Sequence, residues 1–217
     1  MTNSIWENYL KAIYKLTSKN PDGGFTNDIA FELNVKPSSV SEVLKKLSEN
    51  SYINYTKYKA VALTDTGKQI ALKTIRKHRL WEVFLVEKLG YKWDEIHPMA
   101  EELEHIHFDD LTERLAIFLG NPQFDPHGDP IPDENGKMVV NKSIKLTAVQ
   151  LNETVIMIGI DHDSPAFLRH LNKLGLILGT KLTVLEIVEF DKSMMVRMNE
   201  GNEFYMSAEI ASNILCR

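Results

Sequence analysis

The chain has 217 residues, 43% of them hydrophobic, which is enough for one or two domains with well-packed cores. No apolar run approaches the roughly 18 residues of a membrane span, and the N-terminal segment lacks the apolar stretch of a signal peptide, so we expect no membrane partner. A single cysteine, Cys216, excludes an internal disulfide and favours a reducing, cytoplasmic location.

Charge is distributed unevenly along the chain. The formal net charge of −5 argues against a protein that is basic throughout. Residues 1–60 carry eight lysines and six acidic residues, a balance of +2, whereas residues 61–120 carry eight basic and eleven acidic residues, a balance of −3. A mildly basic first part beside an acidic middle is compatible with one segment that faces DNA and another that faces cations.

The first 65 residues have the pattern of a winged helix-turn-helix domain. Helical spacing of apolar residues predicts helices over 4–17, 26–34 and 37–50, the last with Pro37 in its first turn. Two strand-like segments, 52–55 and 60–63, follow and are joined by a basic tip. Helix, short break, helix and two-stranded wing is the arrangement in which the second helix of the pair enters the major groove.

The residues expected to contact DNA lie on that second helix and on the wing tip. Small hydroxyl residues allow a close approach to the bases, and lysines attract the phosphates. Residues 1–60 contain no arginine, so bidentate guanine recognition is not available there, and specificity is expected to depend on DNA shape. A winged helix used only for protein contacts is the alternative. The predicted set is Lys36, Pro37, Ser38, Ser39, Ser41, Lys45, Lys57, Tyr58 and Lys59.

The rest of the chain divides into a helical part, a linker and a β-rich tail. Thr64 is expected to cap a long amphipathic helix that ends near Leu89, and two more helices follow up to about residue 120. Residues 121–145 are rich in Pro, Gly, Asn and Asp, which indicates a linker or long loop. Residues 146–217 contain several short strand-like segments and one helix at about 164–174, which predicts a small β-barrel.

The segment HPMAEELEHIH, residues 97–107, concentrates three histidines and three acidic residues. If it is helical throughout, with about 100° per residue, the side chains of His97, Glu101, Glu104 and His105 fall within an arc of about 100°. Glu102 and His107 fall outside this arc, and the apolar residues form a separate stripe.

The preceding long helix repeats the combination, because His78 and Glu82 lie four residues apart on one face. Two helices with such residues can converge on a divalent cation, and ligands without thiolate suit Mn²⁺, Fe²⁺, Co²⁺ or Zn²⁺. A solvated acidic surface is the simpler alternative. The HExxH motif of zinc peptidases is absent and no Ser/His/Asp order stands out, so we do not expect an enzyme.

Several ordered motifs resemble one family. ENYLKAIY, VKPSSVSEVLKKL, ALTDTGK, RKHRLWEVFL and HPMAEELEHI occur in the order seen in the diphtheria toxin repressor family of iron- and manganese-dependent repressors. VKPSSVS and EELEH are most similar to its manganese transport regulator branch. LNKLGLILGTKLTVLE is similar to the SH3-like domain of the longer members.

The resemblance implies a fold that is mainly α with small β parts, in four segments. These are a winged helix-turn-helix domain (1–65), an all-helical dimerisation and metal-binding domain (66–120), a linker (121–145) and an SH3-like β-barrel (146–217). It implies a homodimer that represses metal-uptake genes at palindromic operators, with Mn²⁺ or Fe²⁺ as corepressor and with Zn²⁺ or Co²⁺ as further ions in vitro.

The resemblance also implies three groups of ligands. Carried over by position, the principal site consists of Asn8, Glu101, Glu104 and His105, and a neighbouring site consists of His78, Glu82 and His97. A secondary site takes Asp125 and His127 from the linker, completed by Asp161 or His162 of the tail domain.

Two positions depart from the family pattern. Manganese-selective members have Asp in place of Asn8 and Glu in place of Lys11, and iron-sensing members have Met in place of Asn8 and Cys in place of Glu101. A second metal bridged through Lys11 is therefore not expected. Two other functions remain open at this point: a winged-helix regulator of an organic effector, and a metal-dependent hydrolase.

Overall fold

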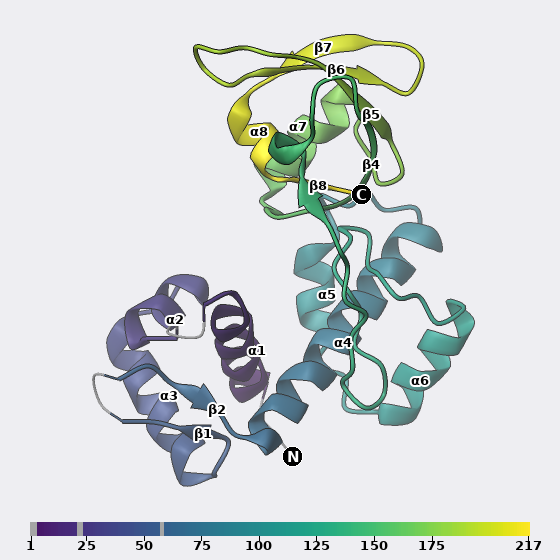
Figure 1. Ribbon diagram of the computed structural model, residues 1–217. Coiled ribbons are helices and arrows are strands. Elements are labelled where there is room, and N and C mark those ends of the chain that lie inside the picture. Colours follow the sequence, from purple (N-terminus) through teal and green to yellow (C-terminus); the bar gives the residue numbers. More distant parts are fainter. Residues whose placement is uncertain (1–3, 21–23, 57–58) are drawn as a thin grey trace. The chain divides into compact units, whose positions relative to one another are not determined.

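The computed structural model describes residues 4–20, 24–56 and 59–217, and Figure 1 shows its helices and strands. The chain forms two compact units, each built from several stretches of sequence. The first consists of residues 1–81, 100–118 and 132–137, and the second of residues 82–99, 119–131 and 138–217. No helix of the described part is both long enough and apolar enough to cross a membrane.

The first unit begins with the predicted winged helix-turn-helix. Its elements are α1 (Ser4–Lys19), α2 (Thr26–Glu32), α3 (Pro37–Glu49), β1 (Ile53–Asn54) and β2 (Ala62–Leu63). The two strands pair antiparallel, with Ile53 opposite Leu63, and form the wing (Figure 1). The three helices and the wing were all predicted from the sequence, within a few residues.

Apolar residues at helical spacing build the core of this domain. Each helix buries one face, and the wing adds Ile53 and Val61. Gly67, in the first turn of the next helix, is required because a Cβ there would collide with the carbonyl of Tyr52. The buried cluster is Tyr9, Leu10, Ile13, Ile29, Ala30, Val40, Leu44, Leu47, Ile53, Val61 and Ala71.

Three helices follow: α4 (Asp65–Glu87), α5 (His97–Leu103) and α6 (Asp109–Phe118). Thr64 caps α4 as predicted, because its hydroxyl accepts a hydrogen bond from the Gly67 amide at 3.1 Å. The prediction of one helix over 97–107 is wrong at its C-terminal end. The amide of Glu104 still donates to Ala100, but Ile106 donates to Leu103, a tighter turn, and His105 and His107 lie beyond the helix.

The strands of the second unit form a six-stranded antiparallel sheet in the order β3-β8-β4-β5-β6-β7. The predicted tail helix is α7, which Ser164 caps and which ends at Gly175 with φ 74°, a left-handed conformation that suits glycine. The elements are β3 (Ile144–Lys145), the 3-10 helix η1 (Leu146–Ala148), β4 (Thr154–Ile160), α7 (Pro165–Leu174), β5 (Lys181–Ile187), β6 (Met194–Met198), β7 (Glu203–Met206), α8 (Ala208–Ser212) and β8 (Ile214–Cys216).

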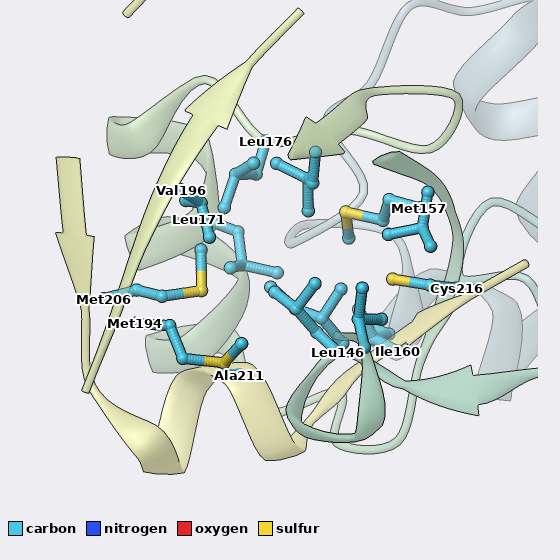
Figure 2. Packing of buried hydrophobic residues seen from close by; sticks show 14 of the residues in the cluster. Leu146, Met157, Ile160, Leu171, Leu176, Met194, Val196, Met206, Ala211 and Cys216 are labelled. Carbon is cyan, nitrogen blue, oxygen red and sulfur yellow. The ribbon is translucent and has the colours of Figure 1, made fainter. Parts of the chain in front are cut away.

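The core of this domain lies between the sheet and the helices α7 and α8, as Figure 2 shows. Alternation along β4 turns Val155 and Met157 inward, and α7 contributes Leu168 and Leu171. The short elements β3, α8 and β8 were not predicted, because two to five residues are too few to show a period.

Cys216 is fully buried in this core, and burial raises the pKa of its thiol to about 12. The thiol is therefore protonated at neutral pH and unsuited to ligating a metal. We expect it to remain unreactive toward a thiol reagent at pH 8 in the folded protein and to react stoichiometrically in denaturant. Rapid reaction without denaturant would contradict this placement.

Candidate metal centre

A largely buried group of charged and imidazole side chains lies in the first unit: Glu7, Lys11, His78, Glu101, Glu104 and His105. Together with Asn8, the neighbour of Glu7 in α1, we call it the first cluster. The side chain of Glu104 is 0% exposed, although carboxylates are rarely buried without partners. Its oxygens lie 2.7 and 2.8 Å from Nζ of Lys11, and Oε2 also lies 2.6 Å from Nδ1 of His78. Glu101 joins through Oε1, at 2.8 Å from the same Lys11 ammonium.

Helix α1 supplies a second part of this cluster. Glu7 is buried, and its Oε2 lies 2.7 Å from Nδ1 of His105. Nδ1 of His107 lies 3.6 Å from the other oxygen of Glu7. Glu7 was not among the ligands predicted from the sequence, and His107 was predicted to lie outside the group. The available signal was the helical spacing of Glu7 to Lys11, four residues apart.

The side-chain oxygen of Asn8 is the feature that points most directly to a bound ligand. This Oδ1 atom is buried and has no hydrogen-bond partner in the structure. An unsatisfied buried oxygen costs free energy, commonly about 1–3 kcal/mol, unless a cation or donor compensates it. Carboxylate, imidazole and amide oxygen are ligands that Mn²⁺ and Fe²⁺ accept, so the residues of the first cluster fit such an ion.

Three of the four residues predicted for the principal site, Glu101, Glu104 and His105, contact residues of helix α1. His105 contacts Glu7 from the turn that follows α5. Because His105 lies beyond the end of the helix, the 100° per residue assumed for residues 97–107 does not apply to it. Lys11 was expected only to be unable to ligate a cation, whereas it lies among the carboxylates.

A second cluster lies in the second unit and comprises Glu82, His97, Asp125 and His127. One potential ligand atom each of Glu82, Asp125 and His127 lies within 4.8 Å of the others, and all three residues are buried. Nδ1 of His97 is 3.6 Å from Glu82. His78, which is predicted to share a site with Glu82 and His97, lies 2.6 Å from Glu104 through Nδ1, and its place in that site stays a prediction.

The loop 125–128 holds its ligands in a defined orientation. Oδ1 of Asp125 accepts from the amides of His127 and Asp129, at 2.8 and 3.0 Å. Nε2 of His127 lies 3.0 Å from the carbonyl oxygen of Trp93, which can only accept, so Nε2 carries the proton. Nδ1 of His127 is then left with its lone pair, and it lies 3.8 Å from Glu82. This is the arrangement that a metal-ligating imidazole requires.

Asp161, the predicted further ligand of this second cluster, makes an ion pair of its own. Its carboxylate lies 3.0 Å from Nζ of Lys145, and both side chains are exposed. His162, the alternative, is exposed and contacts the ring of Phe167. Both follow β4 closely in sequence, but the chain turns there toward the N-terminus of α7.

The predicted DNA-contacting residues belong to α3, with Lys36 directly before it, and to the wing tip. Ser41 is half-buried, and its hydroxyl donates to the carbonyl of Pro37 at 3.1 Å, so it retains only acceptor capacity. Lys57 and Tyr58 of the wing tip lie outside the described residues. The exposed members are Lys36, Pro37, Ser38, Ser39, Lys45 and Lys59.

A winged helix-turn-helix whose first helix enters a buried carboxylate and imidazole cluster defines a metal-regulated DNA-binding protein. Three family models match successive parts of the chain. They are the iron dependent repressor N-terminal DNA binding domain over residues 1–61, the iron dependent repressor metal binding and dimerisation domain over 64–133, and the FeoA domain over 144–217.

Individual proteins agree with these matches. An uncharacterized HTH-type transcriptional regulator of Methanocaldococcus jannaschii is 40% identical over 119 residues, which are 55% of this chain and 94% of that protein. An iron-dependent repressor of Mycobacterium tuberculosis is 32% identical over 126 residues, which are 58% of this chain and only 54% of that protein, so the match spans about half its length. A solved manganese-dependent transcriptional repressor in complex with manganese has a TM-score of 0.88 at 36% identity, covering 97% of this chain and 98% of that one.

The chain belongs to the iron-dependent repressor family of metal-dependent transcriptional regulators. The sequence resemblance to this family is therefore confirmed, as is the fold class, an N-terminal DNA-binding domain followed by a helical metal-binding domain and a strand-rich SH3-like domain.

Proposed function

We propose that this protein is a repressor that binds palindromic operator DNA as a homodimer, with Mn²⁺ or Fe²⁺ as corepressor, and controls metal-uptake genes in the cytoplasm. The proposal assigns it no catalytic activity. The observation that carries it is the composition of the first cluster. Helix α1, which packs in the DNA-binding domain, contributes Glu7 and Lys11 to the same group as Glu101, Glu104 and His105, and the buried oxygen of Asn8 is next to Glu7 in the sequence.

The coupling follows from charge. Glu7, Glu101 and Glu104 bring three carboxylates into one group with a single ammonium, that of Lys11, so their mutual repulsion is offset only in part. A bound divalent cation supplies the positive charge that offsets this repulsion. The proposed holders are Asn8, Glu101, Glu104 and His105, with Glu7 and His78 orienting their neighbours. Ligands on both α1 and α5 then fix the direction of α1.

Fixing α1 matters because α1 and α2 pack against each other and α2 packs on α3, the proposed recognition helix. In a dimer, two such domains read half-sites about 34 Å, or a multiple, apart. The metal-bound state thus favours DNA binding, and DNA in turn tightens metal binding by the same factor.

For the second cluster we propose a separate ion held by Glu82, His97, Asp125 and His127. The hydrogen bond from His127 to the Trp93 carbonyl supports it, because that bond leaves Nδ1 free to ligate. Trp93 also donates through Nε1 to Asn172 of α7 at 2.7 Å, which ties this cluster to the tail domain. We do not include Asp161 in the set.

A titration of operator DNA tests the proposal. We expect Mn²⁺, or Fe²⁺ under anaerobic conditions, to raise the affinity for a palindromic operator roughly 30- to 150-fold, which corresponds to a coupling of about 2–3 kcal/mol. A chelator should reverse the effect, and the protein should elute as a dimer. Tight operator binding that a chelator leaves unchanged would contradict metal control.

A further inference from the structure

Lys11 contacts two acidic residues of the first cluster. Its ammonium group lies 2.8 Å from Oε1 of Glu101 and 2.7 and 2.8 Å from the two oxygens of Glu104. An ammonium has three donors and no acceptor, so these contacts match its capacity. The Lys11 side chain is 18% exposed and the Glu104 side chain 0%.

The chain therefore provides its own cation for these carboxylates. A buried carboxylate without a positive partner is strongly unfavourable, and Lys11 supplies that partner to Glu104. The oxygens that receive its hydrogen bonds belong to the same two carboxylates that we propose as metal ligands. An ammonium and a divalent cation cannot both take these lone pairs at short range, because their positive charges repel.

We propose that Lys11 is an internal counter-cation that competes with the metal for Glu101 and Glu104. It stabilises the ion-free form, and it must withdraw or lose contacts when the metal binds. Its long, flexible side chain and partial exposure provide a path toward solvent. This inference rests on the proposed function, since it assumes that the first cluster binds a metal.

The sign of the effect follows from linkage. An interaction that exists only in the ion-free form stabilises that form by some factor. It lowers the apparent affinity for the ion by the same factor. Removing the Lys11 charge should therefore tighten metal binding while destabilising the ion-free protein. A purely structural lysine would change the stability but not the affinity in this direction.

The experiment measures Mn²⁺ binding to the full chain by electron paramagnetic resonance of the free ion, and thermal unfolding with and without Mn²⁺. Lys11→Met removes the charge and keeps an unbranched chain whose thioether is a poor ligand for Mn²⁺. We expect its dissociation constant at the first cluster to fall about tenfold or more, about 1.4 kcal/mol per tenfold. Its melting temperature without metal should fall as well. Lys11→Gln serves as a second neutral variant.

Two controls separate charge from other effects. Lys11→Arg keeps the positive charge and should stay close to the wild-type affinity. Lys15→Gln removes a lysine one turn further along α1, where it pairs with Glu32 at 3.0 Å in an exposed position, and should leave Mn²⁺ affinity unchanged.

If neutral variants bind Mn²⁺ no more tightly than wild type, or if Lys11→Arg tightens binding equally, competition by the Lys11 charge is wrong. Failure of both neutral variants to fold even with Mn²⁺ also overturns it, because the ion then does not replace the ammonium. If wild type and all variants fail to bind Mn²⁺, the proposed function fails first.

Discussion

Replacing Glu104 by glutamine is expected to abolish the response of operator binding to metal. Glu104 is fully buried, faces both Lys11 and His78, and is the proposed ligand with the most contacts in the first cluster. Loss of even an outer partner of a metal ligand costs about 10- to 100-fold in affinity, so loss of this carboxylate should cost about 100-fold or more. Mn²⁺ titration and operator binding measure the two effects separately.

Glu102→Gln is the matched control for this change. Glu102 lies in the same helix, α5, but is exposed, and the substitution removes the same charge. It should retain both Mn²⁺ affinity and metal-dependent DNA binding. A Glu104→Gln protein that is folded, dimeric and still responds normally to Mn²⁺ would show that the proposed principal site is wrong.

Replacing Gly128 by alanine should destabilise the second unit and disrupt the second cluster. Gly128 directly follows His127, has φ 89°, and lies so close to β4 that a Cβ would collide with the carbonyl of Ile158. A left-handed conformation costs an L-residue about 1–2 kcal/mol, and overpacking adds about 1–3 kcal/mol. We expect a loss of about 2–5 kcal/mol in urea unfolding followed by tryptophan fluorescence.

The same variant should bind one Mn²⁺ ion fewer per chain, because the loop that orients Asp125 and His127 must shift. Gly179→Ala is the control, since Gly179 also has φ 89° but a Cβ there would meet nothing within 4 Å. The free energy of unfolding of Gly179→Ala should fall only by the cost of the left-handed conformation, about 1–2 kcal/mol. The number of Mn²⁺ ions bound per chain should not change. Equal losses in both variants would contradict the close approach to β4.

Much of the fold was accessible from local patterns. The helices α1, α3, α4 and α7 carry apolar faces at a period near 3.6 together with recognisable starts or stops, such as Pro37, Thr64 and Gly175. These signals are local, because capping and amphipathicity depend on neighbours within one or two turns. The brief elements β3, α8 and β8 depend on pairing with distant strands and left no such trace.

The predicted metal ligands show the same division. Residue type and spacing selected Glu101, Glu104 and His105, and the resemblance to the repressor family assigned them to one site and added Asp125 and His127. The arc drawn through 97–107 assumed a helix that in fact ends at Leu103, so the positions of His105 and His107 could not follow from it.

By itself, the sequence determined a winged helix-turn-helix, a helical part rich in acids and histidines, and a β-rich tail. These depend on composition and on periods that each segment carries alone. Only the tertiary structure showed that Lys11 lies between Glu101 and Glu104, that Glu7 pairs with His105, and that Asp161 turns to Lys145. Such contacts join residues up to 98 positions apart in the sequence. Tertiary packing brings these residues together, and no local sequence pattern specifies it.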